Sequence, residues 1–170
     1  NTFFKDLFVD ALKTGILRSK RYNSNQSFTV GERYTRADAC RLLNWKHIVS
    51  GQNIGGYRFD DNLKNCPIFV TYDKRKSHSI NYSKTNRKLD SNEIVKFKDP
   101  DIDLHLFVKK SDDDGVSFIY LGECSSIENS FVQEYQKVIN KKSLEEKTVP
   151  VVSFNLKLKI PVELNRYYML

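Results

Sequence analysis

Long hydrophobic runs are missing from this sequence of 170 residues: no apolar stretch approaches the ~20 residues that a helix needs to cross a bilayer. A secretory signal peptide is also missing. These absences exclude a helical membrane protein, so we expect a cytoplasmic location and no membrane partner. The first residue is Asn1 rather than Met, which we interpret as a piece of a longer protein, with processing or trimming as the alternative.

Cysteine is scarce as well. Cys40, Cys66 and Cys124 are the three in the chain, and they lie far apart. An odd and widely spaced set matches neither a disulfide framework nor a zinc site. We therefore expect buried free thiols in a reducing compartment, and no metal.

Catalytic motifs are missing too. The chain has no GxxxxGK[ST] loop for nucleotide phosphates, and GQNIGG at residues 51–56 lacks the spacing of a dinucleotide-binding fingerprint. His47, His78 and His105 are isolated from one another and from cysteine, so they predict neither a metal triad nor a nucleophile with its base. We expect His105 on the solvent-facing side of a strand, and His78 either solvated or in contact with phosphate.

Close pairs of acidic residues are few. Asp60 with Asp61 and Asp99 with Asp101 lie in turn-like sequence, where Asp carboxylates bond to the local backbone. The run SDDDG at residues 111–115 lacks the alternating spacing and distal Glu of a calcium loop, so it predicts a hairpin turn. We therefore expect a binding module that is not an enzyme by itself and needs no cofactor.

Positive charge is what the sequence does have. Lysine and arginine number 28 against 21 acidic residues, which gives a formal net charge of +7, and the densest cluster lies within residues 53–91. Between Lys74 and Lys88 there are six basic side chains and no acidic one: Lys74, Arg75, Lys76, Lys84, Arg87 and Lys88. A cluster of one sign attracts polyanions, so we interpret it as a surface for nucleic acid, with a solvated loop as the alternative.

The apolar pattern divides the chain into two parts. Residues 1–26 predict an amphipathic helix capped by Thr2 and a basic linker at Ser19–Gln26, which together form a junction to a parent protein. The apolar side chains that recur at helical spacing are Phe3, Phe4, Leu7, Phe8, Ala11, Leu12 and Ile16. This Phe-rich stripe either packs internally or docks on a neighbouring domain. Residues 27–170 form a single domain.

Helix and strand signals alternate within that domain. Thr35 followed by Asp38 predicts a capped helix that reaches Trp45, with Ala39, Leu42 and Leu43 facing inward. Strands are expected at residues 57–59, 67–72, 104–109, 116–121 and 154–160, a turn at 60–65, and a helix or loop at 130–142. Five strands with two or three helices predict an α+β fold, whose twisted, mostly antiparallel sheet would form an open barrel if it curls.

An ordered series of motifs runs from Tyr34 towards the C-terminus. It consists of YTRADA at 34–39, LLNW at 42–45, GYR at 56–58, CPIFVTYDK at 66–74, SK at 83–84, NR at 86–87, LDS at 89–91, LFVKK at 106–110 and YLG at 120–122. The series resembles the C-terminal target recognition domain of SauUSI-like type IV, modification-dependent restriction endonucleases. In that family the domain follows a phospholipase D-like nuclease and a superfamily II helicase. One departure is that many relatives carry an acidic and aromatic insertion where this chain has only Ser77–Asn81.

The resemblance implies a bacterial, cytoplasmic protein whose partner is double-stranded DNA carrying 5-methylcytosine or 5-hydroxymethylcytosine. It also implies an SRA-like form of the sheet. ATP hydrolysis and DNA cleavage, with their ATP and divalent cation, would belong to the adjacent helicase and nuclease domains. The resemblance also allows a homodimeric parent protein.

Recognition of one methyl group favours a closed pocket, because burying a methyl contributes only about 0.8 kcal/mol. Flipping the base against an aromatic ring lets fixed polar groups read its edge. On this hypothesis the pocket residues are Tyr57, Tyr72, Tyr82, Asp73, Asn81 and Ser83, with Asp60 as a further edge reader. Phe59 is a further candidate ring, with packing in the core as the alternative. The phosphate-binding residues are Lys74, Arg75, Lys76, Lys84, Arg87, Lys88 and Arg58.

A second hypothesis belongs to a different class of function. The chain would be a protein-docking module whose basic loop meets an acidic partner and whose Phe-rich helix supplies the hydrophobic anchor. This hypothesis predicts that partner binding survives substitution of Tyr57 or Tyr82 and fails on substitution of Phe4 or Phe8.

Overall fold

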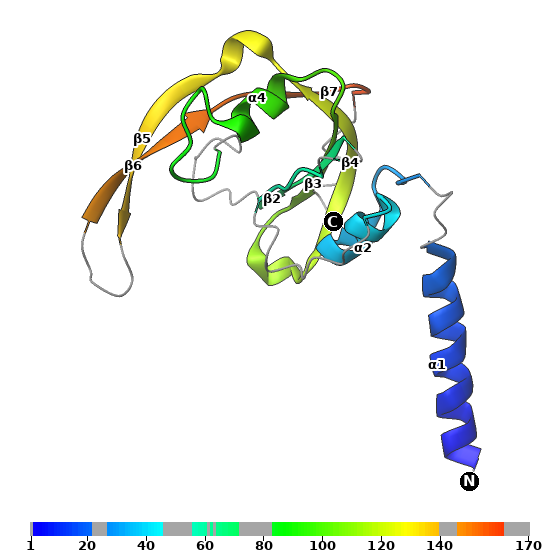
Figure 1. Ribbon diagram of the computed structural model, residues 1–170. Coiled ribbons are helices and arrows are strands. Elements are labelled where there is room, and N and C mark those ends of the chain that lie inside the picture. Colours follow the sequence, from blue (N-terminus) through cyan, green and yellow to red (C-terminus); the bar gives the residue numbers. More distant parts are fainter. Residues whose placement is uncertain are drawn as a thin grey trace.

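The computed structural model describes residues 2–21, 27–45, 56–60, 62, 64–71, 83–139 and 146–161. Within these ranges the chain is α+β, with an N-terminal helix, two further helices and two sheets (Figure 1). The predicted fold class is confirmed.

The main sheet has five strands in the described part of the chain. Their order is β1 (Arg33–Thr35), β4 (Ser117–Ser126), β3 (Asp103–Lys109) and β2 (Asn65–Thr71), and β7 (Leu156–Leu158) pairs with the far end of β4. β2 and β3 are parallel, whereas the other pairs are antiparallel, as predicted for most of the sheet. β1 and β2 lie at opposite ends of this order, so these strands do not close into a barrel.

The turn chemistry of the β3–β4 hairpin matches the prediction. A 3₁₀ turn, η1 (Asp112–Asp114), joins the strands, and the Asp114 carboxylate accepts a hydrogen bond from the Ser111 backbone at 2.9 Å. The register shifts between Leu106 and Phe107, opposite Gly122, whose φ of 123° lies in the region that glycine adopts without strain.

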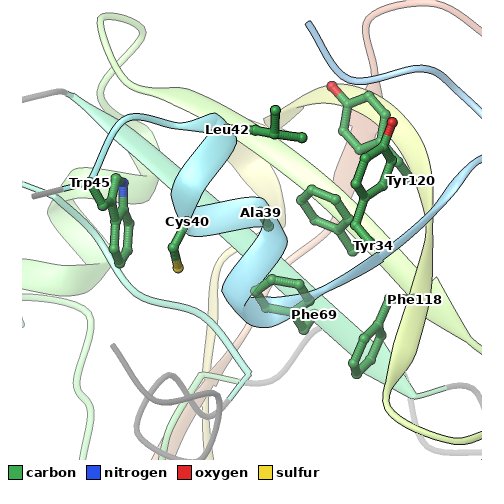
Figure 2. Packing of buried hydrophobic residues seen from close by; sticks show 9 residues of the cluster. Tyr34, Ala39, Cys40, Leu42, Trp45, Phe69, Phe118 and Tyr120 are labelled. Atoms are coloured by element: carbon green, nitrogen blue, oxygen red, sulfur yellow. The ribbon is translucent and has the colours of Figure 1, made fainter. Parts of the chain in front are cut away.

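Helix α2 (Arg36–Leu42) packs on one face of the main sheet (Figure 2). It begins with the predicted capping box, because the Thr35 hydroxyl accepts from the Asp38 backbone at 3.1 Å and the Asp38 carboxylate accepts from the Thr35 backbone at 3.0 Å. The buried cluster beneath it consists of Tyr34, Ala39, Cys40, Leu42, Trp45, Phe69, Phe107, Phe118 and Tyr120.

Helix α4 (Asn92–Lys98) packs on the opposite face. Its Ile94 and Phe97 are buried among side chains of β2, β3 and the C-terminal strands. The sequence reading assigned no helix here. The signal was nevertheless present, since Ser91 precedes the helix and Ile94 and Phe97 are three residues apart.

The second sheet is a hairpin of β5 (Val132–Ile139) and β6 (Glu146–Ser153), which Figure 1 shows projecting beyond α4. The prediction of a helix or loop at residues 130–142 is therefore wrong over the span of β5. That segment mixes apolar and polar residues without clear alternation, and its strand is defined by eight paired residues of β6 that come later in the chain.

One of the predicted strands did not form, and another is shorter than expected. Tyr57 makes only an isolated antiparallel bridge with Ile68, so 57–59 is not a strand. The predicted strand 154–160 is interrupted after Phe154, because the Asn155 carbonyl accepts from Ile127 at 2.9 Å and its amide donates to the Ser130 hydroxyl at 2.8 Å. Only Leu156–Leu158 then pairs with β4.

Helix α1 (Thr2–Arg21) confirms the predicted N-terminal helix, although residues 19–21 of the expected linker are helical. Figure 1 shows α1 extending away from the sheets. Its apolar stripe is exposed where its side chains are described, with Phe3, Phe4 and Phe8 at 71%, 67% and 66% of their full accessible surface. No helix among the described residues is long and apolar enough to span a membrane.

The structure shows where the three cysteines and His105 lie. Cys40, Cys66 and Cys124 are buried free thiols, as predicted, and burial raises the pKa of Cys40 to about 11. The expectation that His105 faces solvent is wrong: it is buried, with Nδ1 at 3.1 Å from the Tyr120 hydroxyl. β3 lies between β2 and β4, and Phe28 packs against the imidazole ring, so this side of the strand is covered too.

Candidate nucleic-acid interface

The candidate site is centred on a short basic segment, residues 83–88, which is the C-terminal part of the basic cluster and precedes α4. The site residues that fall outside the described ranges are Tyr72, Asp73, Lys74, Arg75, Lys76, Asn81 and Tyr82, together with His47 and His78. Both borders of residues 72–82 are described, because β2 ends at Thr71 and Ser83 begins the basic segment.

The basic segment is fixed along an edge of β6. The Ser83 amide donates to the Val152 carbonyl at 2.8 Å, and the Val152 amide donates to the Ser83 hydroxyl at 2.9 Å. Further along, the Arg87 amide donates to the Pro150 carbonyl at 3.2 Å. The buried Ser83 is therefore an anchor of this segment, and its hydroxyl has partners within the protein.

Tyr57 joins the basic segment to the core. Its ring is 4% exposed and packs edge-to-face against Phe97 of α4, with 4.8 Å between ring centroids. Its hydroxyl accepts a hydrogen bond from the Lys84 backbone at 3.2 Å and donates one to the Glu93 carboxylate at 3.1 Å. The Lys84 ammonium lies 4.6 Å from the centre of the same ring, within range of a cation–π contact.

The position of Tyr57 bears on its expected role in the base pocket. A base can stack only on an accessible ring face, and this ring is buried under Lys84 and among Phe59 and Phe97. The structure thus places Tyr57 as a support for the basic segment. Phe59 also packs in this cluster, with its ring 4.8 Å from that of Phe97.

Glu93 of α4 links Tyr57 to Arg87 of the basic segment, and it was not predicted as a site residue. Its carboxylate accepts from Arg87 Nε at 2.6 Å. Partial burial opposes ionisation of Glu93, but hydrogen bonds from Arg87 and Tyr57 outweigh it, so the pKa of Glu93 lies below its ordinary value. The same bond raises the pKa of Arg87. Arg87 therefore has an internal counter-charge, unlike a residue committed wholly to phosphate.

The remaining described cations have different degrees of exposure. Arg58 and Lys88 are exposed, and Lys84 is half-buried over Tyr57. Asp60 caps its own turn, since its carboxylate accepts from the Asn62 backbone at 2.9 Å. The Asp99 carboxylate accepts in the same way from the Asp101 backbone at 2.9 Å, so the predicted local backbone bonding is confirmed for Asp60 and Asp99. These observations leave Lys84, Lys88 and Arg58 as the described side chains best placed to meet an external anion.

Gln133 of β5 connects the hairpin to the basic segment. Its side-chain amide donates to the carbonyls of Arg87, at 3.3 Å, and Val151, at 2.8 Å, and its carbonyl accepts from the Leu89 backbone at 3.2 Å. Sequence reasoning missed this residue because the segment around it was not recognised as a strand.

Metal binding has no support within the described ranges, where no three His, Cys, Asp or Glu side chains lie close enough together to hold an ion. The described site is instead a set of cations held by neutral and acidic side chains. Its chemistry is electrostatic and hydrogen-bonding.

Comparison with known protein families identifies the family of this chain. The model of the family described as a domain of unknown function, DUF3427, matches residues 28–170. Among curated proteins there is no match to the sequence. Because the family match covers well over half of the chain, the protein belongs to the DUF3427 family.

Proposed function

We propose that this domain recognises modified cytosine, either 5-methylcytosine or 5-hydroxymethylcytosine, in double-stranded DNA. The proposal includes the SauUSI-like setting, in which a type IV restriction endonuclease supplies ATP hydrolysis and cleavage from its helicase and nuclease domains. This domain would contribute recognition without catalysis.

One observation carries the proposal: the end of the densest basic cluster is anchored on three sides. β6 holds the backbone of Ser83 and Arg87, Tyr57 holds that of Lys84, and Glu93 orients the Arg87 side chain. Anchoring keeps the cations in place before any ligand arrives, which lowers the entropic cost of gripping a phosphate backbone. A solvated charged loop would need no such framework.

The anchored segment also fits a base-flipping mechanism. A flipped base needs a pocket whose borders stay in place while phosphates on either side are held. Thr71 at the end of β2 and Ser83 on β6 are two such borders, and residues 72–82 between them include Tyr72 and Tyr82. With Tyr57 buried, we assign stacking to Tyr72 or Tyr82 and edge reading to Asp73 or Asn81.

Salt-dependent binding tests the role of the cations. Lys84→Gln and Lys88→Gln should each weaken binding to methylated and plain duplexes equally, and should reduce the slope of log Kd against log salt by about 1, because each removes one phosphate contact. Lys157→Gln, an exposed lysine on β7, is the matched control. Fluorescence anisotropy over a salt series measures the slope, and an unchanged slope in both variants would remove these lysines from the interface.

A second candidate function rests on α1. Its Phe3, Phe4, Leu7, Phe8 and Leu12 side chains are exposed on one helix, a pattern suited to docking on a protein surface. On this alternative the domain is an interaction module, and its basic segment meets an acidic partner. Pull-down of adjacent domains of a parent protein by the wild type, but not by Phe4→Ser with Phe8→Ser, would favour it.

A further inference from the structure

The β5–β6 hairpin continues the surface formed by the basic segment. The amide and carbonyl of Val152 both face Ser83, so the basic segment lies along the edge of β6 opposite to β5. The Arg87 amide bonds to the Pro150 carbonyl, and Pro150 is paired with Tyr135 across the hairpin. These three residues therefore lie in one row across three neighbouring backbones. The backbones of neighbouring strands are ~4.8 Å apart, which places Arg87 and Tyr135 about 10 Å apart.

Tyr135 has an exposed aromatic ring beside this segment. Of the tyrosines in the described ranges, Tyr34, Tyr57 and Tyr120 are buried, whereas Tyr135 is 69% exposed. It shares a face of β5 with Gln133, two residues away, because side chains alternate along a strand. Gln133 bonds to Arg87 and Leu89 across that face, so Lys88 and Leu89 lie on the side of the hairpin that Tyr135 occupies.

The residues around Tyr135 favour a nucleic acid over a protein strand. Lys137 follows on the same face with 71% of its side chain exposed, beside its ion-pair partner Glu146 at 3.0 Å. Residues 137–147 contain four lysines and two glutamates in sequence. Charged side chains on an outer strand also oppose the addition of another strand. An exposed aromatic ring beside lysines suits a DNA duplex, because lysines neutralise its phosphates and an apolar ring packs against base edges in a groove.

We propose that the face of the β5–β6 hairpin carrying Tyr135 is a second contact with duplex DNA, next to the base that the domain inspects. Tyr135 packs against a nucleotide that flanks the recognised cytosine, and Lys88 meets a phosphate beside it. The proposal rests on the proposed function and adds to it the element that holds the flanking nucleotides. The major groove of B-DNA, ~12 Å wide, admits a two-stranded β-ribbon such as this hairpin.

The experiment compares wild type, Tyr135→Ala and Val138→Ala in the full 170-residue chain. Val138 lies three residues away on the other face of β5, which makes it the matched control. Each protein is titrated into two duplexes that differ by one 5-methylcytosine, over a salt series. We expect Tyr135→Ala to weaken binding to both duplexes about tenfold, with the salt slope and the methyl preference unchanged, and Val138→Ala to bind as wild type.

The controls separate this inference from the proposed function. If wild type prefers the methylated duplex and Tyr135→Ala binds both duplexes as tightly as wild type does, the hairpin contact is refuted and the proposed function stands. If wild type binds neither duplex at low salt, both fail. Sedimentation velocity tests whether the Tyr135 face instead contacts a second copy of the chain. If Tyr135→Ala loses self-association and keeps full DNA binding, the hairpin contact with DNA is also overturned. Circular dichroism confirms that each variant is folded.

Discussion

At the scale of single residues, Tyr57 shows how one hydroxyl can organise a basic surface. It donates to Glu93 and accepts from Lys84, and its ring lies under the Lys84 ammonium. The sequence places Tyr57 beside the basic cluster, which made it a candidate for stacking on a base. Burial could not be predicted, because α4 and its Phe97 cover the ring from a helix that lies later in the chain.

Tyr57→Phe tests this supporting role. The change leaves the ring in place and removes the hydroxyl, so the Lys84 amide and the Glu93 carboxylate each lose a partner. We expect a loss of about 1 to 2 kcal/mol in the free energy of unfolding, measured by urea denaturation. Tyr135→Phe, at the exposed position, should change it by less than about 0.5 kcal/mol. An unchanged stability for Tyr57→Phe, together with loss of the methyl preference, would return Tyr57 to the base pocket.

His105 gives a prediction about pH. Burial lowers the pKa of His105 below 6.5 in the folded protein, although the carboxylates of Glu123 and Asp103 partly oppose this shift. A lowered folded-state pKa means that the neutral form stabilises the fold above pH 6.5, and that this contribution is lost as the pH falls from 6.5 through the folded-state value.

The measurement is the free energy of unfolding of wild type and His105→Gln between pH 7.5 and pH 5. Wild type should lose stability over this range, whereas the variant should show a flatter profile because it lacks the titrating group. Parallel profiles for the two proteins would contradict the assignment.

At the scale of helices and strands, the sequence predicted the structures whose hydrogen bonds join residues close together in the chain. The capping box at Thr35 and Asp38 and the turns at Asp60 and Asp99 all formed as expected, since their partners lie within three residues. β5 was not predicted because its structure depends on pairing with β6. The split after Phe154 likewise depends on Ile127 and Ser130, which belong to a distant turn.

The capping box provides a test at this scale. Thr35→Ala removes the acceptor for the Asp38 amide, and we expect a loss of about 1 kcal/mol in the free energy of unfolding. Thr35→Ser keeps a hydroxyl and should retain most of that stability. Denaturant unfolding distinguishes the two, and equal losses in both variants would mean that the methyl group of Thr35, rather than its hydroxyl, stabilises the start of α2.

At the scale of the whole molecule, α1 differs from the two other described helices. α2 and α4 each bury side chains in a core, whereas the Phe residues of α1 are exposed. The amphipathic pattern of α1 was readable in the sequence, but whether that face packs inside the domain depends on contacts that no local pattern encodes. The domain boundary expected at residue 27 stays a prediction.

Phenylalanine substitutions compare these helices directly. Phe4→Ser with Phe8→Ser should leave the free energy of unfolding nearly unchanged, because both rings are already exposed. Phe97→Ala, which removes a ring that is 2% exposed, should cost about 3 to 5 kcal/mol. Guanidinium unfolding measures both. A loss of several kcal/mol in the α1 variant would show that this helix packs against the domain in solution.

The distribution of positive charge is the sequence feature on which the proposed function depends. The net charge of +7 and the six cations between Lys74 and Lys88 were visible in the sequence, and they predicted a polyanion as partner. The framework that holds the described part of this cluster, residues 83–88, was not visible, because Glu93, Gln133 and Pro150 reach it from α4, β5 and β6. The residues assigned to the base pocket from Tyr72 to Tyr82 lie outside the described ranges, so their roles stay predictions.

The measurement that tests the central claim most directly is equilibrium binding of the chain to two DNA duplexes that are identical except for one 5-methylcytosine. Fluorescence anisotropy at low and physiological salt gives both affinities. We predict binding to both duplexes that weakens with salt, and a preference of about tenfold for the methylated one, the discrimination expected when a closed pocket surrounds one methyl group. Equal affinity for the two duplexes, or no binding to either at low salt, would contradict the account.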